Sequence, residues 1–206
     1  MKHARLNYKL VLAGIGLLSL TCCVPPTTLT RSWSDPSVSN GEFKPFKKVL
    51  VIARFRDATT QHIGEDRIVS EFKPGVAIPS YNYLSTSDST NSAILKRLKN
   101  DGFDGVVLMR LTDVRESVNV QSTGGMYGPY GYGYGYGYGY PAYNNTTVSV
   151  DKTFYVETCI FSLPSNKLIW SGTTSTFEPS SFSRALDEII TANKTEMIKR
   201  GLLKQP

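Results

Sequence analysis

Hydrophobic and polar residues follow two different rhythms along this chain, and each rhythm predicts one kind of element. Short runs rich in β-branched residues predict strands, and apolar stripes that repeat every three or four residues predict helices. Predicted strands cover residues 48–53, 75–84, 106–111, 114–120, 147–163 and 168–177, and predicted helices cover 59–72, 89–100 and a last segment from residue 182. This order predicts an α/β (α+β) fold in which a single mixed β-sheet carries about three helices.

The last predicted helix is amphipathic. Five apolar residues share one of its faces: Phe182, Leu186, Ile189, Ile190 and Met197. Ser181 or Ser183 can cap its first turn, because a serine hydroxyl accepts hydrogen bonds from free backbone N–H groups there. Gly201 is a suitable stop for the helix. The helix is therefore expected to pack its apolar face on the sheet.

The first 22 residues do not belong to this domain pattern. Lys2, Arg5 and Lys9 precede an uncharged run from Leu10 to Leu20, and small residues follow. This order is typical of a secretory signal peptide. Eleven residues rise only about 16 Å as a helix, against roughly 30 Å of hydrocarbon, so the run is too short to cross a membrane.

The end of this segment resembles the bacterial lipoprotein signal, in which a Leu-small-small-Cys box is cut and the cysteine is diacylated. Lipidation at Cys23 places Leu20 three residues before it, and is the preferred assignment. Lipidation at Cys22 places Ser19 and Thr21 in the box, and stays open as the alternative. No aspartate follows either cysteine, so the resemblance implies lipid anchoring in the outer membrane of a Gram-negative cell, on its periplasmic face.

Residues 23–41 are rich in proline, serine and threonine, which predicts an extended tether that buries little surface. Trp33 is the exception, and we expect it to pack on the domain where the tether joins it. Residues 42–206 then form a single α/β domain by the usual size range.

The charge of the mature chain argues against nucleic acid as a partner. Without the signal peptide, 20 basic residues face 17 acidic ones, and no basic stripe with interleaved aromatic residues is present. Asn-x-Thr triplets at Asn144, Asn145 and Asn193 have no expected role behind a bacterial signal.

A low-complexity Gly/Tyr insertion at residues 124–145 interrupts the domain. Eight of the twelve tyrosines lie between Tyr127 and Tyr143. Because glycine loses the most backbone freedom on folding, the insertion is expected to be a disordered loop rather than a regular strand. Three interpretations stay open: a tolerated surface insertion, a contact region for an envelope protein or a glycan, and self-association of the low-complexity sequence. The candidate contact residues are Tyr130, Tyr132, Tyr134, Tyr136, Tyr138 and Tyr140.

Candidate chemistry is sparse in the mature chain. His62 is its one histidine, so neither a catalytic triad nor a zinc site is predicted. Glu65 and Asp66 are interpreted as surface carboxylates that pair with Arg67. The DGFDG stretch is interpreted as turn chemistry, because it lacks the closing glutamate of a calcium loop. We therefore predict no catalytic residue, no metal, no cofactor and no enzyme activity.

Cys159 lies among apolar neighbours in a predicted strand, where a free thiol behaves as a small hydrophobic group. It is expected to be buried and inert. A disulfide between Cys159 and Cys23 stays open only if Cys22 is the lipidated residue, because Cys23 then remains free in an oxidising compartment.

Four stretches carry a wider resemblance: WSDP at Trp33, KKVLVIARFRD, NDGFDGVVLMRL and NKLIWSGTTST. With the last helix, they resemble uncharacterised bacterial outer-membrane lipoproteins that share a conserved domain of unknown function. The architecture is also similar to the periplasmic lipoproteins that activate penicillin-binding proteins and to the curli-secretion lipoprotein. The resemblance implies a non-enzymatic accessory or interaction module of the cell envelope. A structural subunit of a secretion or surface assembly is the alternative, and a periplasmic hydrolase is a third.

Overall fold

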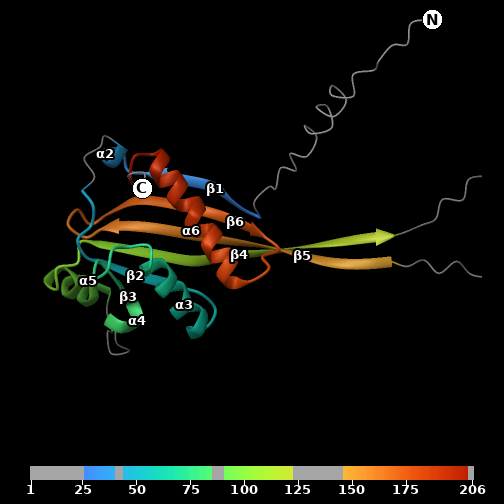
Figure 1. Cartoon of the computed structure of the whole chain (residues 1–206), viewed down its shortest axis with the longest axis horizontal. Helices are drawn as coiled ribbons and strands as arrows, with labels where there is room; N and C mark the ends of the chain where they lie inside the picture. Colours follow the sequence, from blue (N-terminus) through green and yellow to red (C-terminus); the bar gives the residue numbers. More distant parts are fainter. Residues whose placement is uncertain (1–25, 40–43, 85–90, 123–145, 204–206) are drawn as a thin grey trace, which may run out of the picture.

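A computed structural model describes residues 26–39, 44–84, 91–122 and 146–203. Its strands are β1 (Thr27–Ser34), β2 (Val49–Arg54), β3 (Ala77–Pro79), β4 (Gly105–Ser122), β5 (Thr146–Ser162) and β6 (Lys167–Phe177). Its helices are α2 (Pro36–Ser39), α3 (Ala58–Val69), α4 (Ser80–Tyr83), α5 (Asn91–Asn100) and α6 (Phe182–Lys199). The strands form one sheet in the order β1-β6-β5-β4-β2-β3 (Figure 1).

The sheet is mixed, as predicted. β2 pairs in parallel with β3 and β4, whereas β1, β6, β5 and β4 follow one another antiparallel. The three predicted helices are α3, α5 and α6, and α2 and α4 add one turn each. Within the described ranges, no helix is both long and apolar enough to cross a membrane.

Helices cover both faces of the sheet at β2. Val49 and Val51 of β2 face the core shared with α3 and α6, whereas Leu50 faces the core that α5 closes. All three side chains are fully buried because both faces are covered at this point. Ser181 caps α6 by accepting a hydrogen bond from Arg184 N at 3.2 Å, and Gly201 ends the helical region with φ of +76°.

The predicted strands 106–111 and 114–120 are one strand, β4, with a register shift between Leu111 and Asp113. The extra residue on β4 opposite β5 is a β-bulge. Because of it, Leu111 and Val114 both point to the side of the sheet that carries α3 and α6. From the Glu116–Lys152 pair onward, β4 and β5 continue as a two-stranded arm that projects from the sheet (Figure 1).

The start of the folded body differs from the predicted tether. Thr27–Ser34 is extended, as expected, but it pairs with β6 as the edge strand β1. Thr27 is buried, and its hydroxyl lies 2.9 Å from that of Thr176. Trp33 stays 46% exposed instead of packing on the domain, because successive residues of a strand point to opposite sides of the sheet and its side chain faces outward. Composition indicated a linker because the segment's own side chains bury little surface.

The predicted strand 75–84 is also shorter than expected. Only Ala77–Pro79 pairs with β2, and the chain then turns into α4. Pro79 has no backbone N–H to donate to a further strand, which fits the position of β3 at the edge of the sheet.

A buried carboxylate joins this edge to α3. Glu65 is fully buried and accepts hydrogen bonds from Ala53 N at 3.0 Å and Ser80 Oγ at 2.6 Å. Its other oxygen accepts from Ser80 N at 2.7 Å and Tyr81 N at 3.3 Å. One side chain of α3 thereby binds β2 and the first turn of α4, where free N–H groups favour negative charge. The sequence prediction of Glu65 as a surface residue is wrong.

We predict that Glu65→Gln lowers the free energy of unfolding by about 2–4 kcal/mol, because one acceptor oxygen is replaced by an NH2 group that faces donors. Urea unfolding of the soluble chain measures the change. Asp66→Asn is the matched control, since Asp66 is the exposed neighbour on the same helix, and it should change stability by less than about 1 kcal/mol. Equal effects of the two changes would contradict the structural role of Glu65.

Candidate binding pocket

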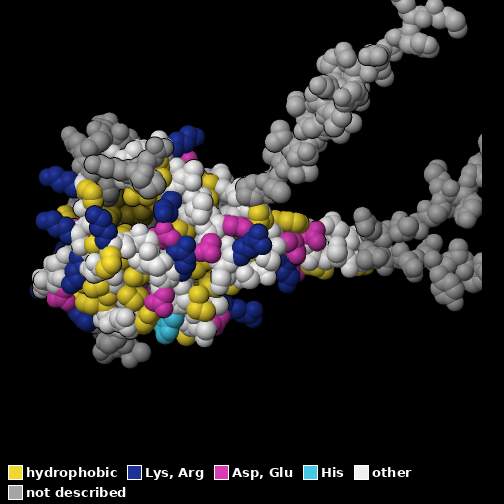
Figure 2. Space-filling view, viewed as in Figure 1, with side chains coloured by type: hydrophobic (Ala, Val, Ile, Leu, Met, Phe, Trp, Pro, Cys, Tyr) yellow, Lys and Arg dark blue, Asp and Glu magenta, His cyan; other side chains and the backbone are white. Residues whose placement is uncertain are grey.

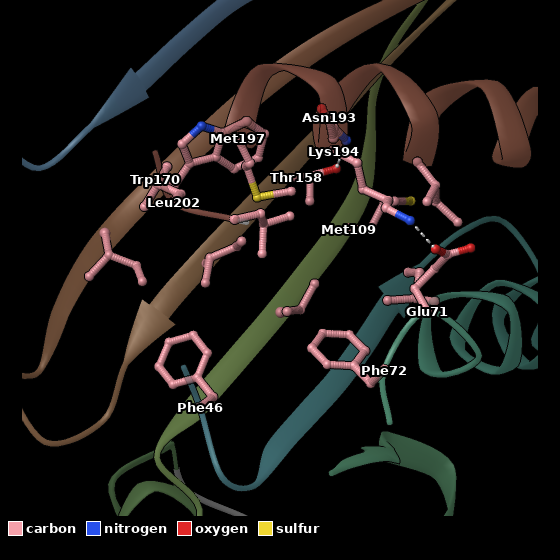
Figure 3. A pocket seen from close by; sticks show the side chains of 16 residues that line it. Phe46, Glu71, Phe72, Met109, Thr158, Trp170, Asn193, Lys194, Met197 and Leu202 are labelled. Carbon is pink, nitrogen blue, oxygen red and sulfur yellow. Dashed lines mark hydrogen bonds and ion pairs between the residues drawn. The ribbon is translucent and has the colours of Figure 1, made fainter. Parts of the chain in front are cut away.

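A cavity of about 200 Å³ lies between α6, the sheet and the end of α3 (Figure 3). It is larger than the ~150 Å³ engineered cavities that hold benzene. Figure 2 shows a hollow lined with hydrophobic side chains near the C-terminal end of the described chain. The main apolar lining residues are Phe46, Phe72, Val107, Met109, Trp170 and Met197.

The sheet supplies the floor of the pocket and α6 supplies its roof. Asn193 of α6 lies 3% exposed in the apolar stripe of the helix, and its Nδ2 donates to Thr158 Oγ1 at 2.9 Å. Gly172 of β6 permits this approach, since a Cβ there would lie 2.4 Å from the Trp170 ring and 3.1 Å from Asn193 Oδ1. A larger residue at position 172 would therefore push α6 and the indole apart.

Two buried polar atoms beside the pocket have no hydrogen-bond partner among the described residues: Trp170 Nε1 and Asn193 Oδ1. Buried polar atoms are usually paired, so both lower the stability of an otherwise apolar site. Trp170 is fully buried and Asn193 nearly so. Because unpaired buried polar atoms are rare in native cores, this part of the core is a candidate site.

The rim of the pocket carries an ion pair. Lys194 Nζ donates to Glu71 Oε2 at 2.6 Å (Figure 3). Arg67 contacts the other oxygen of Glu71. The hydrogen bond from Lys194 is the main cause that lowers the pKa of Glu71 below its ordinary value of 4.5, and Arg67 lowers it further. The site therefore combines an apolar interior with a charged edge.

A second pocket adjoins the first and is more polar. The two share Phe46 and Ile169 in their walls. Lys44 and Lys47 line the second pocket and are exposed. Asp104, also in its wall, accepts hydrogen bonds from Lys47 N and Lys48 N at 2.8 and 2.9 Å. A ligand that spans both pockets would meet apolar surface first and basic side chains next.

A third hollow, of about 640 Å³, lies at the root of the arm. It is bounded by Phe55, by Val114 and Phe154 of the β4–β5 pair, and by Phe182 at the start of α6. Phe55 and Phe182 meet edge to face with their ring centroids 5.2 Å apart. This hollow shares none of the lining residues of the first pocket.

The sequence-predicted chemistry lies elsewhere. His62 is exposed on α3, with its ring centroid 4.2 Å from that of Tyr81. The Tyr81 hydroxyl donates to Asp66, which is the main cause that raises the pKa of Tyr81 to about 12. Arg67 pairs with Glu71 and with Asp187, at 2.6 Å for the latter, so its predicted pairing with Glu65 and Asp66 is wrong.

The DGFDG stretch forms a turn, as predicted, but its aspartates bind groups outside the turn. Gly102 has φ of +78°, and Asp101 accepts a hydrogen bond from the Tyr83 hydroxyl at 2.6 Å. Asp104 orders the backbone at the start of β2. Among the residues that the structure describes, no group of three or more His, Cys, Asp or Glu side chains could hold a metal ion.

Cys159 is a free, buried thiol, as predicted, and desolvation raises its pKa to about 11. It therefore stays protonated and unreactive at neutral pH. Both candidate lipidation sites, Cys22 and Cys23, lie outside the described residues. So do the candidate contact residues from Tyr130 to Tyr140.

Sequence reasoning missed the pocket itself. The one available signal is Asn193, a polar residue at the same helical spacing as Leu186, Ile190 and Met197. The triplet at Asn193 gave no hint of this, and its side chain is buried against Thr158. The contribution of Phe46 could not be found, because it precedes β2 in a segment without periodic pattern.

We predict that Glu71→Gln removes a pH-dependent part of the stability, on the order of 1 kcal/mol at neutral pH. Because the folded pKa of Glu71 is lowered, its contribution is present above pH 4.5 and is lost as the pH falls through the folded pKa. The difference in unfolding free energy between wild type and Glu71→Gln should thus shrink from pH 6 to pH 3.

The exposed arm residue Glu116, which pairs with Lys152 at 2.9 Å, supplies a control carboxylate. Glu116→Gln should give a smaller difference than Glu71→Gln at pH 6, because exposed pairs contribute little. A difference for Glu71→Gln that stays constant over this pH range would contradict the assignment.

Comparison with protein-family models and with curated proteins gives no match. Solved structures with a similar fold share little sequence with this chain. The PelC dodecamer from Paraburkholderia phytofirmans is 13% identical with a TM-score of 0.45, covering 87% of this chain and 99% of that one. Lipoprotein GNA1162 from Neisseria meningitidis is 14% identical with a TM-score of 0.41, covering 74% of this chain and 98% of that one. Likenesses at these values indicate nothing about function.

Proposed function

We propose that this chain is a lipid-anchored protein of the cell envelope, held on the periplasmic face of the outer membrane, and that it acts as a non-enzymatic interaction module. The signal segment with its two cysteines supports the anchor. The pocket beneath α6 supports the binding role, and is the single observation that carries it.

The pocket has the anatomy of a site for an apolar anchor residue. Its interior is apolar and its edge carries the Glu71–Lys194 pair, which matches the apolar centre and polar rim of protein interfaces. Met109 and Met197 line it, and unbranched methionine side chains adapt readily to the shape of a bound group. A glycan would leave its hydroxyl groups unpaired in such an interior, so a protein partner fits better.

The adjoining basic pocket defines the partner further. Phe46 and Ile169 connect the two pockets, and Lys44 and Lys47 lie on the far side of this wall. A partner segment with an apolar side chain next to a carboxylate would bury the apolar side chain in the first pocket. Its carboxylate would then pair with Lys44 or Lys47 in the second pocket. We therefore propose that the partner is an envelope protein with a segment in which an apolar side chain lies next to a carboxylate.

Site-specific photocrosslinking in cells tests this proposal. A benzophenone amino acid replaces Leu203, which lines the pocket and is 39% exposed, and in a second strain replaces Leu95, which is 40% exposed on α5. We expect a crosslinked envelope protein from position 203 and not from position 95. The mapped adduct should lie beside an acidic residue of the partner.

The double change Lys44→Glu with Lys47→Glu should lower the yield at position 203 about two- to tenfold, since each exposed charge pair contributes little and the two add. Identical products from both positions, or a yield unaffected by the charge reversal, would argue against this binding mode.

The anchor is tested separately by palmitate labelling of cells. We expect Cys23→Ser to abolish the label and Cys22→Ser to retain it. The reverse result would move the lipidation site to Cys22. Label that survives both single changes and the double change would contradict the lipoprotein assignment.

A further inference from the structure

The β4–β5 arm extends well beyond the rest of the sheet. β5 pairs with β6 only from Thr153 onward, whereas it continues to pair with β4 as far as Thr146. Seven residue pairs, from Glu116–Lys152 to Ser122–Thr146, therefore have no third strand beside them. At about 3.4 Å per residue the arm is roughly 24 Å long. Figure 1 shows it clear of α6 and of the body.

The two faces of the arm differ in chemistry. On the face that continues the side of α3 and α6, the ion pair of Glu116 and Lys152 lies at the base of the arm. Beyond it, Val118 opposes Val150 and Val120 opposes Val148. These four side chains are 62%, 47%, 62% and 57% exposed, respectively. The other face is polar, and there Asn119 donates a hydrogen bond to Asp151. An isolated two-stranded ribbon is marginally stable in water, so an apolar face of this kind needs a partner.

The start of the folded chain lies at the root of this arm. Pro26 O accepts a hydrogen bond from Phe177 N at 2.9 Å, and Phe177 pairs with Thr153 of β5. Glu178 N in turn donates to Lys152 O at 3.0 Å. Strands lie about 4.8 Å apart, so Pro26 is on the order of 10 Å from the first pair of the arm.

Only two residues separate Cys23 from Pro26 in the sequence. Fully extended, this connection reaches about 10 Å, and from Cys22 about 14 Å. A lipid on either cysteine therefore keeps the root of the arm close to the bilayer surface. The arm is longer than this connection, so it can reach the membrane that carries the anchor.

We propose that the valine face of the arm (Val118, Val120, Val148 and Val150) docks on the lipid bilayer that holds the anchor, with the Asn119–Asp151 face toward water. This inference rests on the proposed lipid anchor. The anchor makes the docking intramolecular, so a small apolar patch is sufficient. Four valines per copy present on the order of a few hundred Å² at most, against about 1,200 Å² in a stable protein dimer, which favours a lipid surface over a second copy.

Depth-dependent quenching tests the proposal in the lipidated full-length protein. Val148→Trp and Ser149→Trp are made in a Trp33→Phe background, which removes the exposed native indole. The two new indoles lie at neighbouring positions of β5 but on opposite faces of the arm. The proteins are reconstituted in phosphatidylethanolamine–phosphatidylglycerol vesicles with brominated or unbrominated acyl chains. Trp170, which is fully buried, provides the common background and reports that the body is folded.

Bromine should quench the added emission of Val148→Trp at least twofold more than that of Ser149→Trp. Equal emission with and without bromine, or equal quenching at both positions, overturns the proposal. So does a disulfide between two copies of Val118→Cys, mapped to position 118 in the same vesicles, since it would assign the face to a second copy.

Mass spectrometry of the N-terminal peptide separates this proposal from the one on which it rests. Acylated protein without quenching of Val148→Trp contradicts the arm proposal and leaves the anchor intact. An N-terminal peptide without acyl chains contradicts the anchor, and the arm proposal is overturned with it because the tethering argument is lost.

Discussion

The register of β4 on β5 is the constraint on which most of this structure depends. Side chains alternate between the two faces of a strand, so a shift of one residue exchanges the faces. The bulge between Leu111 and Asp113 is such a shift, and it occurs where the sheet gives way to the arm. Without it, Asp113 and Arg115 would continue the helix-bearing face. With it, Val114 and Val118 do, and the Glu116–Lys152 ion pair separates the valines of the arm from the core.

The same two strands form the floor of the pocket. Val107 and Met109 of β4 and Ile160 of β5 face α6, while Trp170 and Gly172 of the next strand set how closely the helix approaches. α6 cannot close fully on the sheet, because the indole and the Asn193 side chain occupy the space above Gly172. The cavity is thus a consequence of packing a large aromatic residue and a polar residue beneath one helix.

The pocket and the start of the described chain lie at different ends of β6. β1 begins opposite Thr176, next to the root of the arm, and ends opposite Trp170 at the pocket. Six residues of strand separate the two points, which is about 20 Å. The proposed lipid anchor would therefore keep the arm near the membrane and the pocket farther from it. This separation suits a protein that is fixed to the membrane and receives a partner on its distal side.

Much of the fold was determined by the sequence itself. The apolar runs of β2 and β6, the capped stripe of α6 and the stop at Gly201 are local patterns, and each was predictable because its physical cause lies within a few residues. Cys159 in its apolar strand and the turn at Gly102 followed from the same kind of local reasoning.

Only the tertiary structure decided the rest, because the causes lie far apart in the chain. Thr27–Ser34 is a strand because β6, some 140 residues later, offers an unpaired edge. Glu65 is buried because Ala53 and Ser80 bring backbone donors to it from two other segments. The pocket joins residues from Phe46 to Leu203, and no local pattern records that proximity. The sequence determined most of the elements, whereas long-range pairing created the pocket and the arm.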